Sequence, residues 1–357
     1  MYNFIKKIDN VYAAYAIYAD KLICNIGDGN SSHITFFDSS YNKINELSQT
    51  SYDFFIYNQL LFFTTQTIID TNNKKILESY LLKLSNKQLI KLPYTLNIKG
   101  IKYEDKYICV GYKGCLELGK ENYYFIIDLN TFNIEKEISR RNTESRNLKY
   151  FFGNKLFFSD SIQKLICCCD CNGKQVWQQD LKEILKYQYN KKDVYGQIKQ
   201  VKQYKDSLIA VSDGGVVKLQ IETGEILWKS KTYARTMEII GNIGYVCTNH
   251  SLYKINLETG EISGYGWEYH RLPDFEYNGK KYWAVGHEVI YHDGLLWYSV
   301  YSSGHSFLLA INPSNGNYEW IHHVETNEKT ASPQFHENKM FLLDTGSTLH
   351  IYEKEKR

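Results

Sequence analysis

The sequence predicts an all-β chain built from a repeated antiparallel unit. Three observations favour this fold class: the apolar runs are rich in β-branched and aromatic residues, glycine or asparagine turns separate them, and the same order of runs and turns recurs along the chain. The chain has 357 residues, of which 43% are hydrophobic and 23% charged, a balance typical of a folded protein. Because the composition is uniform from end to end, we expect a single domain over residues 1–357.

Each unit contains a predicted β-hairpin. The clearest copies are Ile221-Glu-Thr-Gly-Glu-Ile-Leu-Trp228 and Leu257-Glu-Thr-Gly-Glu-Ile262. Other copies start at Phe36, Ile68, Ile126, Cys169 and Ile311. Glycine stands where the turn requires a positive φ in four copies, at Gly173, Gly224, Gly260 and Gly316. In two weaker copies we expect Asn73 and Asn133 to take this place, because asparagine tolerates the left-handed region.

A further apolar run, introduced by a polar turn, precedes most hairpins. Examples are Asp20-Lys-Leu-Ile-Cys24, Asp206-Ser-Leu-Ile-Ala-Val211 and Asn338-Lys-Met-Phe-Leu-Leu343. The combined pattern occurs eight times, which gives about 45 residues per unit, the size of a four-stranded propeller blade. The sequence therefore predicts a β-propeller of about eight four-stranded blades. A seven-bladed ring and a solenoid of antiparallel β units are the alternatives.

The two ends of the chain carry complementary parts of one unit. Residues 339–352 supply two strands but no outer strand, and residues 2–8 form a strand before the first complete unit. We expect strand 2–8 to complete the last blade, because this pairing closes the ring and protects a sheet edge. Residues 181–187 alone have apolar residues at helical spacing, which predicts a short surface helix between two blades.

Three tryptophans follow the hairpin turns at a fixed distance, at Trp177, Trp228 and Trp320. A Thr-Gly-Glu turn followed by tryptophan resembles the pyrroloquinoline-quinone-type (PQQ-like) propeller repeat. The resemblance is clear in the fourth to seventh units and weak in the first three, which lack the tryptophan. It implies that each of these tryptophans docks its ring against the neighbouring blade and ties the ring of blades together.

The resemblance implies two kinds of function. Some members of the family are calcium- and quinone-dependent dehydrogenases, and others are non-catalytic scaffolds, such as an outer-membrane assembly lipoprotein. The sequence contains no recognisable set of calcium-binding carboxylates with a catalytic aspartate, and no motif that joins a nucleophile, a base and an orienting group. We therefore expect a non-enzymatic protein without a cofactor.

Two groups of residues suggest a metal site but are better explained by structure. Cys167, Cys168, Cys169 and Cys171 lie in one predicted strand, whose successive side chains point to opposite faces and cannot converge on tetrahedral zinc. Eight of the ten histidines fall between His270 and His350, but they are scattered over turns and strands. We therefore expect buried thiols, polar loops and no bound metal.

A long insertion separates the sixth and seventh units. It runs from Gly264 to Trp283 and is dense in tryptophan, tyrosine and arginine, the residues enriched at binding hot spots. We expect it to bind a partner through Trp267, Tyr269, His270, Arg271, Phe275, Tyr277 and Trp283. The alternative is that the insertion packs on the propeller itself. A smaller insertion, from Gly111 to Tyr123, is expected to add to the rim.

Charge and hydropathy narrow the expected partners and location. The net charge of +2, without a sustained basic run, argues against nucleic-acid binding. The N-terminus has no secretory signal and no segment predicts a membrane helix, so we expect a cytoplasmic protein whose eight cysteines are reduced.

Together these features predict a non-enzymatic protein-binding propeller that is monomeric on its own. It would serve as a scaffold, or as an immunity protein that inhibits a cognate partner. The alternative is an enzyme, or a small-ligand or metal binder, that uses the central channel or the top face.

Overall fold

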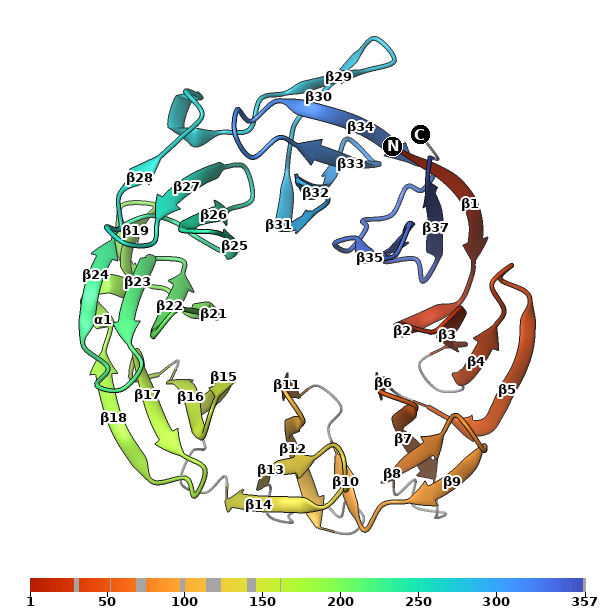
Figure 1. Cartoon of the computed structure of the whole chain (residues 1–357). Helices are drawn as coiled ribbons and strands as arrows, with labels where there is room; N and C mark the ends of the chain where they lie inside the picture. The colour runs from red at the N-terminus through yellow and green to blue at the C-terminus, as the bar shows by residue number, and fades with distance from the viewer. Residues whose placement is uncertain are drawn as a thin grey trace.

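The computed structural model describes residues 1–28, 32–51, 53–68, 75–96, 100–113, 123–139, 146–160 and 162–355. These residues form eight antiparallel blades arranged around a common axis (Figure 1). The predicted eight-bladed β-propeller is thereby confirmed over the seven-bladed ring and the solenoid. Within the described part of the chain, no helix has the length and hydropathy needed to cross a bilayer.

The first four blades each run outwards from an innermost strand near the axis of the ring. Blade 1 comprises β2 (Val11–Tyr18), β3 (Lys21–Ile26), β4 (His33–Phe37) and β5 (Lys43–Thr50). Blade 2 comprises β6 (Asp53–Tyr57), β7 (Leu60–Ile68), β8 (Lys75–Lys83) and β9 (Gln88–Lys91). Blade 3 has β10 (Tyr94–Leu96) and β11 (Ile101–Tyr103), both paired with β12 (Lys106–Lys113), then β13 (Tyr123–Asp128) and β14 (Ile134–Ser139). Blade 4 comprises β15 (Arg146–Phe152), β16 (Lys155–Asp160), β17 (Leu165–Asp170) and β18 (Gln175–Asp180).

The remaining blades follow the same order. Blade 5 comprises β21 (Ile198–Tyr204), β22 (Ser207–Ser212), β23 (Gly215–Gln220) and β24 (Ile226–Ser230). Blade 6 comprises β25 (Thr236–Ile240), β26 (Ile243–Cys247), β27 (Leu252–Asn256) and β28 (Ile262–Ser263). Blade 7 comprises β31 (Gly286–His292), β32 (Leu295–Ser302), β33 (His305–Ile311) and β34 (Tyr318–Val324). Blade 8 comprises β35 (Gln334–His336), β36 (Lys339–Leu343), β37 (Leu349–Lys354) and β1 (Tyr2–Ile8).

The antiparallel order of the strands gives the ring two different faces. The turns between the second and third strands, and the connections from one blade to the next, leave at one face, which we call the connection face. The turns between the first and second strands, and between the third and fourth, leave at the other, which we call the turn face. Every connection between consecutive blades therefore reaches the same side of the ring.

Strand β1 closes the ring, as predicted. It pairs antiparallel with β37 from Tyr2 opposite Lys354 to Ile8 opposite Leu349, so that the two ends of the chain lie side by side (Figure 1). The C-terminal part supplies three strands of this blade rather than the two predicted, because β35 also pairs with β36. This inner strand has only three residues, too few to show an apolar run in the sequence.

Successive residues of the inner strands face opposite neighbouring blades. Cys167 and Cys169 pack in the core between blades 3 and 4, whereas Cys168 packs in the core between blades 4 and 5. The thiols therefore point apart, as the strand pattern predicted. Burial raises the pKa of Cys168 to about 12, which keeps its thiol protonated and makes it a poor metal ligand.

The turn between the third and fourth strands has a residue in the left-handed region. The four predicted glycines, Gly173, Gly224, Gly260 and Gly316, have φ values of 80°, 75°, 77° and 79°. The prediction for Asn133 is wrong, because Phe132 is the left-handed residue (φ 60°). The N–H of Phe132 donates to the carbonyl of Asp128 at 2.8 Å, the contact that Gly224 makes with Gln220, and this hydrogen bond fixes the position of the turn. Asn73 lies outside the described residues.

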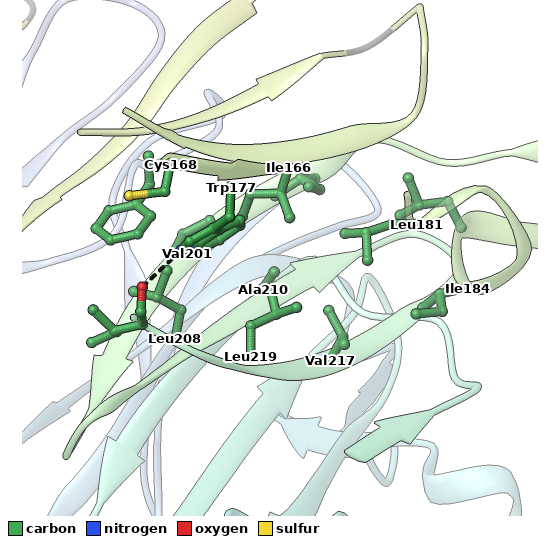
Figure 2. Packing of buried hydrophobic residues seen from close by; sticks show 14 residues of the cluster. Ile166, Cys168, Trp177, Leu181, Ile184, Val201, Leu208, Ala210, Val217 and Leu219 are labelled. Atoms are coloured by element: carbon green, nitrogen blue, oxygen red, sulfur yellow. Dashed lines mark hydrogen bonds between the residues drawn. The ribbon is translucent and has the colours of Figure 1, made fainter. Parts of the chain in front are cut away.

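Trp177 fastens blade 4 to blade 5 (Figure 2). Its Nε1–H donates to the carbonyl of Ile221 at 2.9 Å. Its ring lies directly on the turn at Gly224, where an added Cβ would come within 2.5 Å of the ring. Glycine is therefore needed at this turn for two reasons, its positive φ and the close approach of the ring. This is the contact that the resemblance to the PQQ-like repeat implies.

The next tryptophans around the ring make related contacts. Trp228 of blade 5 donates to the carbonyl of Leu257 at 3.1 Å and lies on Gly260 of blade 6. Trp320 of blade 7 packs with the core of blade 8, and its ring centroid is 6.4 Å from that of Tyr2 in the closing strand β1. Tryptophan docking and ring closure thus meet at the junction between blades 7 and 8.

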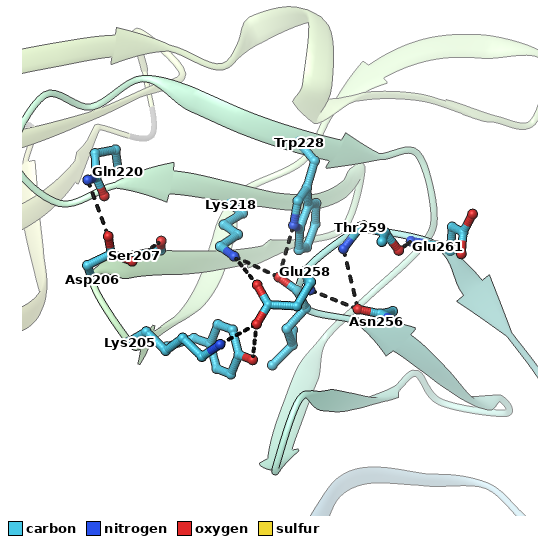
Figure 3. Close-up of polar contacts among 12 residues, drawn as sticks. Lys205, Asp206, Ser207, Lys218, Gln220, Trp228, Asn256, Glu258, Thr259 and Glu261 are labelled. Carbon is cyan, nitrogen blue, oxygen red and sulfur yellow. Dashed lines mark hydrogen bonds and ion pairs between the residues drawn. The ribbon is translucent and has the colours of Figure 1, made fainter.

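A group of polar side chains supports the junction between blades 5 and 6 (Figure 3). The buried Lys218 donates to the carbonyl of Leu257 at 2.9 Å and pairs with Glu258 at 3.3 Å. Glu258 also accepts hydrogen bonds from Lys205 and from Tyr204. The hydrogen bonds from Lys205 and Tyr204 lower the pKa of Glu258 to about 2. This carboxylate therefore neutralises a lysine that is buried beside the docked Trp228.

Deletion of residues 1–10 should cause a large drop in the melting temperature or loss of the folded protein. The reason is that β37 would lose its partner along a whole strand and Trp320 would lose part of its packing. Thermal unfolding followed by circular dichroism measures the effect. A deletion variant that melts at the temperature of the parent would show that closure by β1 does not stabilise the ring.

Replacement of Glu258 by glutamine should reduce stability in a pH-dependent way. Because the folded-state pKa of about 2 lies below the ordinary value of 4.5, this carboxylate stabilises the fold above pH 4.5, and the contribution is lost as the pH falls toward 2. The melting temperatures of the parent and Glu258→Gln should therefore differ most near neutral pH and converge in acid. Glu261→Gln, on the same turn, is the control and should show no such convergence.

Candidate partner-binding surface

Two long connections extend the connection face of the ring. Residues 181–197 join blades 4 and 5 and contain α1 (Lys182–Leu185) followed by the hairpin of β19 (Lys186–Tyr189) and β20 (Lys192–Tyr195). Residues 264–285 join blades 6 and 7 and contain the short helix η2 (Glu268–His270) and the hairpin of β29 (Phe275–Tyr277) and β30 (Lys280–Tyr282). Both connections lie on the same side of the disc.

The first connection was only partly predicted. The expected helix is a single turn, and its apolar residues Leu181, Ile184 and Leu185 are buried between blades 4 and 5. The hairpin that follows was missed. The sequence signal for this hairpin is Asn190-Lys191 at the turn. In the structure these two residues have φ values of 51° and 61°, and a two-residue hairpin turn requires such positive values.

A hollow of about 870 Å³ lies between this hairpin and the loops of blades 5 and 6. Its wall is formed by Glu183, Lys186, Tyr187, Gln188, Tyr189, Asp193, Asp213, Gly214, Lys231, Thr232 and Tyr233. The rings of Tyr187 and Tyr233 lie side by side in this wall, tilted by 59° with centroids 6.3 Å apart. Lys186 pairs with Asp193 at 2.8 Å across the hairpin and holds the pKa of that carboxyl below its ordinary value. The hollow therefore has an aromatic wall and charged groups of both signs.

The first part of the second connection fastens two blades together. Trp267 lies on the turn of blade 7, where a Cβ added to Gly316 would come within 2.5 Å of its ring. The neighbouring Tyr265 donates to the carbonyl of Pro313 at 3.1 Å. Trp267 is therefore half-buried against blade 7, and partner binding by its ring stays a prediction. Blade 6 has Ser263 opposite Lys254, where blade 5 has Trp228 opposite Lys218, so the insertion supplies the ring that β28 lacks.

The hairpin of this connection also packs on the propeller. Phe275 is buried, with its ring centroid 5.0 Å from that of Phe307 in blade 7. Tyr277 is half-buried and lies 5.6 Å from Phe307 and 5.7 Å from His323. For these two residues the alternative is therefore correct: this part of the insertion packs on the propeller itself. The tip of the hairpin projects beyond the ring (Figure 1).

The remaining residues of the insertion reach solvent. Tyr269 is 85% exposed and Trp283 is 61% exposed. Arg271 is also exposed, and it pairs with Asp274 at 3.1 Å. His270 is half-buried over the ring of Tyr253, at 5.5 Å between centroids. Partner binding by Tyr269, Arg271 and Trp283 stays a prediction.

Ring contacts and hydrogen bonds through Tyr233 and Tyr253 link the two connections. Tyr253 of blade 6 donates to the carbonyl of Tyr233, next to the hollow, and its ring supports His270 of the insertion. The hydroxyl of Ser251 reaches the carbonyl of Tyr269 at 3.5 Å. We call the exposed side chains of this region the aromatic surface: Tyr189, Tyr195, Tyr233, Tyr269 and Trp283. Sequence reasoning found Tyr269 and Trp283 but missed the three tyrosines, which lie in ordinary polar segments.

The histidines of the last blades have separate surroundings. His305 and His323 contact each other at 3.3 Å, His292 stacks on Phe335, and His350 is buried against Asp344 at 2.9 Å. Among the residues that the structure describes, no group of three or more histidine, cysteine or acidic side chains is placed to hold a metal ion. The side chain of His287 and residues 114–122 of the smaller insertion lie outside the described part of the chain.

Comparison with known proteins identifies the repeat. Residues 163–340 match the family described as outer membrane protein assembly factor BamB. The chain belongs to the PQQ-like β-propeller repeat family. The matched region covers the outer two strands of blade 4 and all of blades 5 to 7, where the sequence has the turn-and-tryptophan pattern. No curated protein matches the sequence of this PQQ-like propeller.

Solved structures share the fold of this PQQ-like propeller at low sequence identity. BamB from Moraxella catarrhalis has a TM-score of 0.55 at 11% identity, and the match covers 99% of this chain and all of that one. A europium-containing methanol dehydrogenase has a TM-score of 0.57 at 10% identity, with 99% and 93% covered. The dihydro-heme d1 dehydrogenase NirN has a TM-score of 0.55 at 10% identity, with 95% and 73% covered. At this identity the likeness shows the fold alone.

Replacement of Trp267 by alanine should destabilise this PQQ-like propeller by about 3 kcal/mol, because it empties the junction between blades 6 and 7. Tyr269→Ala is the matched control from the same loop, and it should change stability by less than about 0.5 kcal/mol because its ring lies in solvent. Chemical denaturation measures both. Equal stabilities for Trp267→Ala and the parent would contradict the docking role of Trp267.

Proposed function

We propose that this propeller is a non-enzymatic protein-binding module that holds its partner on the aromatic surface of the connection face. The observation that carries the proposal is the placement of the two long connections. Both rise on one face and carry exposed aromatic side chains, and the first forms one wall of a hollow of about 870 Å³. Tyrosine and tryptophan supply large contact areas with few rotatable bonds, which is why they dominate binding hot spots.

The rigidity of the ring supports the same proposal. The aromatic surface rests on the packed cores of blades 5 to 7, and the insertion is anchored by Trp267 and Phe275. A partner that binds here would therefore meet side chains already held in place, and little conformational freedom would be lost on binding. The exposed charges around the hollow, among them Glu183 and Lys231, would set the orientation of the partner.

The role that fits such a module is a scaffold or an inhibitor of a cognate protein. The matching family is described as an assembly factor, which is in keeping with a protein that acts through binding. An immunity protein that covers its partner's working surface would use the same rigid aromatic face. We place this function in the cytoplasm, where the buried cysteine thiols would stay reduced.

The test begins with capture of partners from cells that produce the tagged protein, followed by calorimetry on the purified pair. The double variant Tyr189→Ala/Tyr269→Ala should weaken binding by about 30-fold or more, the effect of ~2 kcal/mol, because it removes one ring from each connection. Its melting temperature should stay close to that of the parent, because both rings are exposed. Tyr291→Ala is the control, since Tyr291 is 41% exposed on the inner strand of blade 7 near the turn face.

Two outcomes would overturn the proposal. Unchanged affinity of the double variant would place the binding surface elsewhere on the ring. Saturable binding of calcium and pyrroloquinoline quinone by the purified protein, with oxidation of an alcohol and reduction of an artificial dye, would favour the alternative of a catalytic propeller. In that second case the Tyr189→Ala/Tyr269→Ala variant would still show whether the aromatic surface binds protein.

A further inference from the structure

The junction between blades 1 and 2 lacks a docked ring at the two positions where most other junctions carry one. Asn45 of β5 pairs with Phe36, in the register in which Trp177 of β18 pairs with Cys168, so Asn45 stands in the tryptophan position. On the other side of the junction, Lys87 is the left-handed residue of the blade 2 turn, with a φ of 58°. Neither the outer strand nor the turn therefore supplies an aromatic side chain at these two positions.

Two other junctions without a docking tryptophan are filled by the turn itself, whereas between blades 3 and 4 the aliphatic side chain of Ile138 lies against the turn at Gly173. At the junction between blades 8 and 1, the turn residue Tyr41 is 6% exposed and packs with Phe341 and Ile351 of blade 8. At the junction between blades 2 and 3, the turn residue Phe132 lies 5.3 Å from Phe62 of blade 2. A ring on the turn thus replaces a ring on the preceding blade.

A hollow of about 410 Å³ occupies the junction between blades 1 and 2. It is lined by Tyr18, Lys21, Ile23, Phe36, Ile44, Asn45, Leu47, Leu82, Leu84, Lys87 and Leu89, and we call it the blade 1–2 slot. The base is buried and apolar, and the exposed side chains of Ile44 and Leu89 form its rim. An apolar hollow with an exposed aliphatic rim is costly to hydrate and favours an apolar occupant.

We propose that the blade 1–2 slot binds a tryptophan side chain carried by an acidic segment of a partner protein. The chain's own junctions indicate the tryptophan. The N–H of Leu84 donates to the carbonyl of Gln59 at 2.8 Å, as the N–H of Ile221 donates to Asp206 at 3.2 Å. The carbonyl of Leu84 therefore corresponds to the carbonyl of Ile221, which accepts the indole hydrogen of Trp177.

The charge of the slot indicates the acidic segment. Lys21 and Lys87 are the charged residues of its lining, both exposed, and no carboxylate is among the described lining residues. Two ammonium groups at the rim attract carboxylates on either side of the bound ring. A lysine ammonium over an indole face adds a cation–π contribution.

The bound ring would lie differently from Trp177. Trp177 rests on the backbone at Gly224, but Lys87 carries a Cβ at the corresponding place. A tryptophan in the slot would therefore lie against the side chains of Leu84 and Leu89, further from the turn. The slot opens among residues of the turn face and the outer strands, away from the aromatic surface, so this proposal does not depend on the function proposed above.

The probe is the peptide acetyl-Asp-Glu-Ile-Leu-Trp-Asp-Ser-amide with a fluorine label on the indole, titrated with the full chain and followed by fluorine NMR. The parent protein should bind it saturably. Ile44→Asp should weaken binding by about tenfold or more, because it puts a carboxylate on the apolar rim beside the acidic peptide. Leu227→Asp is the matched control. The two residues are similarly exposed, Leu227 at 47% and Ile44 at 53%, and each stands three residues after a left-handed turn residue. They differ in that Leu227 lies beside a junction that Trp228 already fills.

A second variant supplies the missing ring within the chain. Asn45→Trp should weaken peptide binding by about tenfold or more, because its own indole competes for the slot. The combined variant Asn45→Trp/Lys87→Gly restores both halves of the docking contact and should melt at a higher temperature than Asn45→Trp alone.

Several results would overturn the proposal. The first is that the parent protein does not bind the peptide at millimolar concentration. The second is that Ile44→Asp binds the peptide as tightly as the parent does. The third is that the parent binds equally well a peptide in which alanine replaces the tryptophan. Self-association of the parent that Ile44→Asp abolishes, measured by sedimentation, would show instead that a second copy of the chain covers the slot.

Discussion

The packing of apolar side chains, most often aromatic rings, around a left-handed turn at the junction of two blades is the interaction on which the whole ring depends. A single four-stranded blade is apolar on both faces and cannot bury either face alone. The ring of Trp177 buries apolar area on both blades at once, and its indole hydrogen bonds to a carbonyl of the neighbouring turn. Such a contact sets the position of one blade relative to the next, and the junctions together bring β1 to β37.

The junctions differ in which element supplies the side chain that packs there. Blades 4 and 5 carry the tryptophan on their outer strands, and the next turn offers a glycine. Blades 1 and 3 carry the ring on the turn itself, at Tyr41 and Phe132, and tolerate a side chain in the left-handed region because burial of the ring offsets the backbone strain. Blade 6 takes its ring from the insertion at Trp267. Between blades 1 and 2, where the outer strand and the turn offer no ring at these positions, a hollow remains.

The insertion between blades 6 and 7 combines two tasks that the sequence does not separate. Trp267 and Phe275 pack into the propeller, and this packing holds Tyr269 and Trp283 in solvent on the connection face. The antiparallel order of the blades brings the other long connection to the same face, because every connection between blades must leave there. The aromatic surface is thus a consequence of topology, since its members lie far apart in the sequence.

The sequence by itself determined the repeat, a ring of about eight blades, the pairing of the first strand with the last blade and the left-handed glycines. Each of these follows from the recurring order of apolar runs and turns, which can be recognised in short stretches of neighbouring residues. Only the tertiary structure decided whether an aromatic residue faces a neighbouring blade or solvent, because that depends on which residues of the adjacent blade lie opposite it. Trp267 and Tyr269 are two residues apart and equally aromatic, yet Gly316 of the next blade receives one ring and the other lies in solvent.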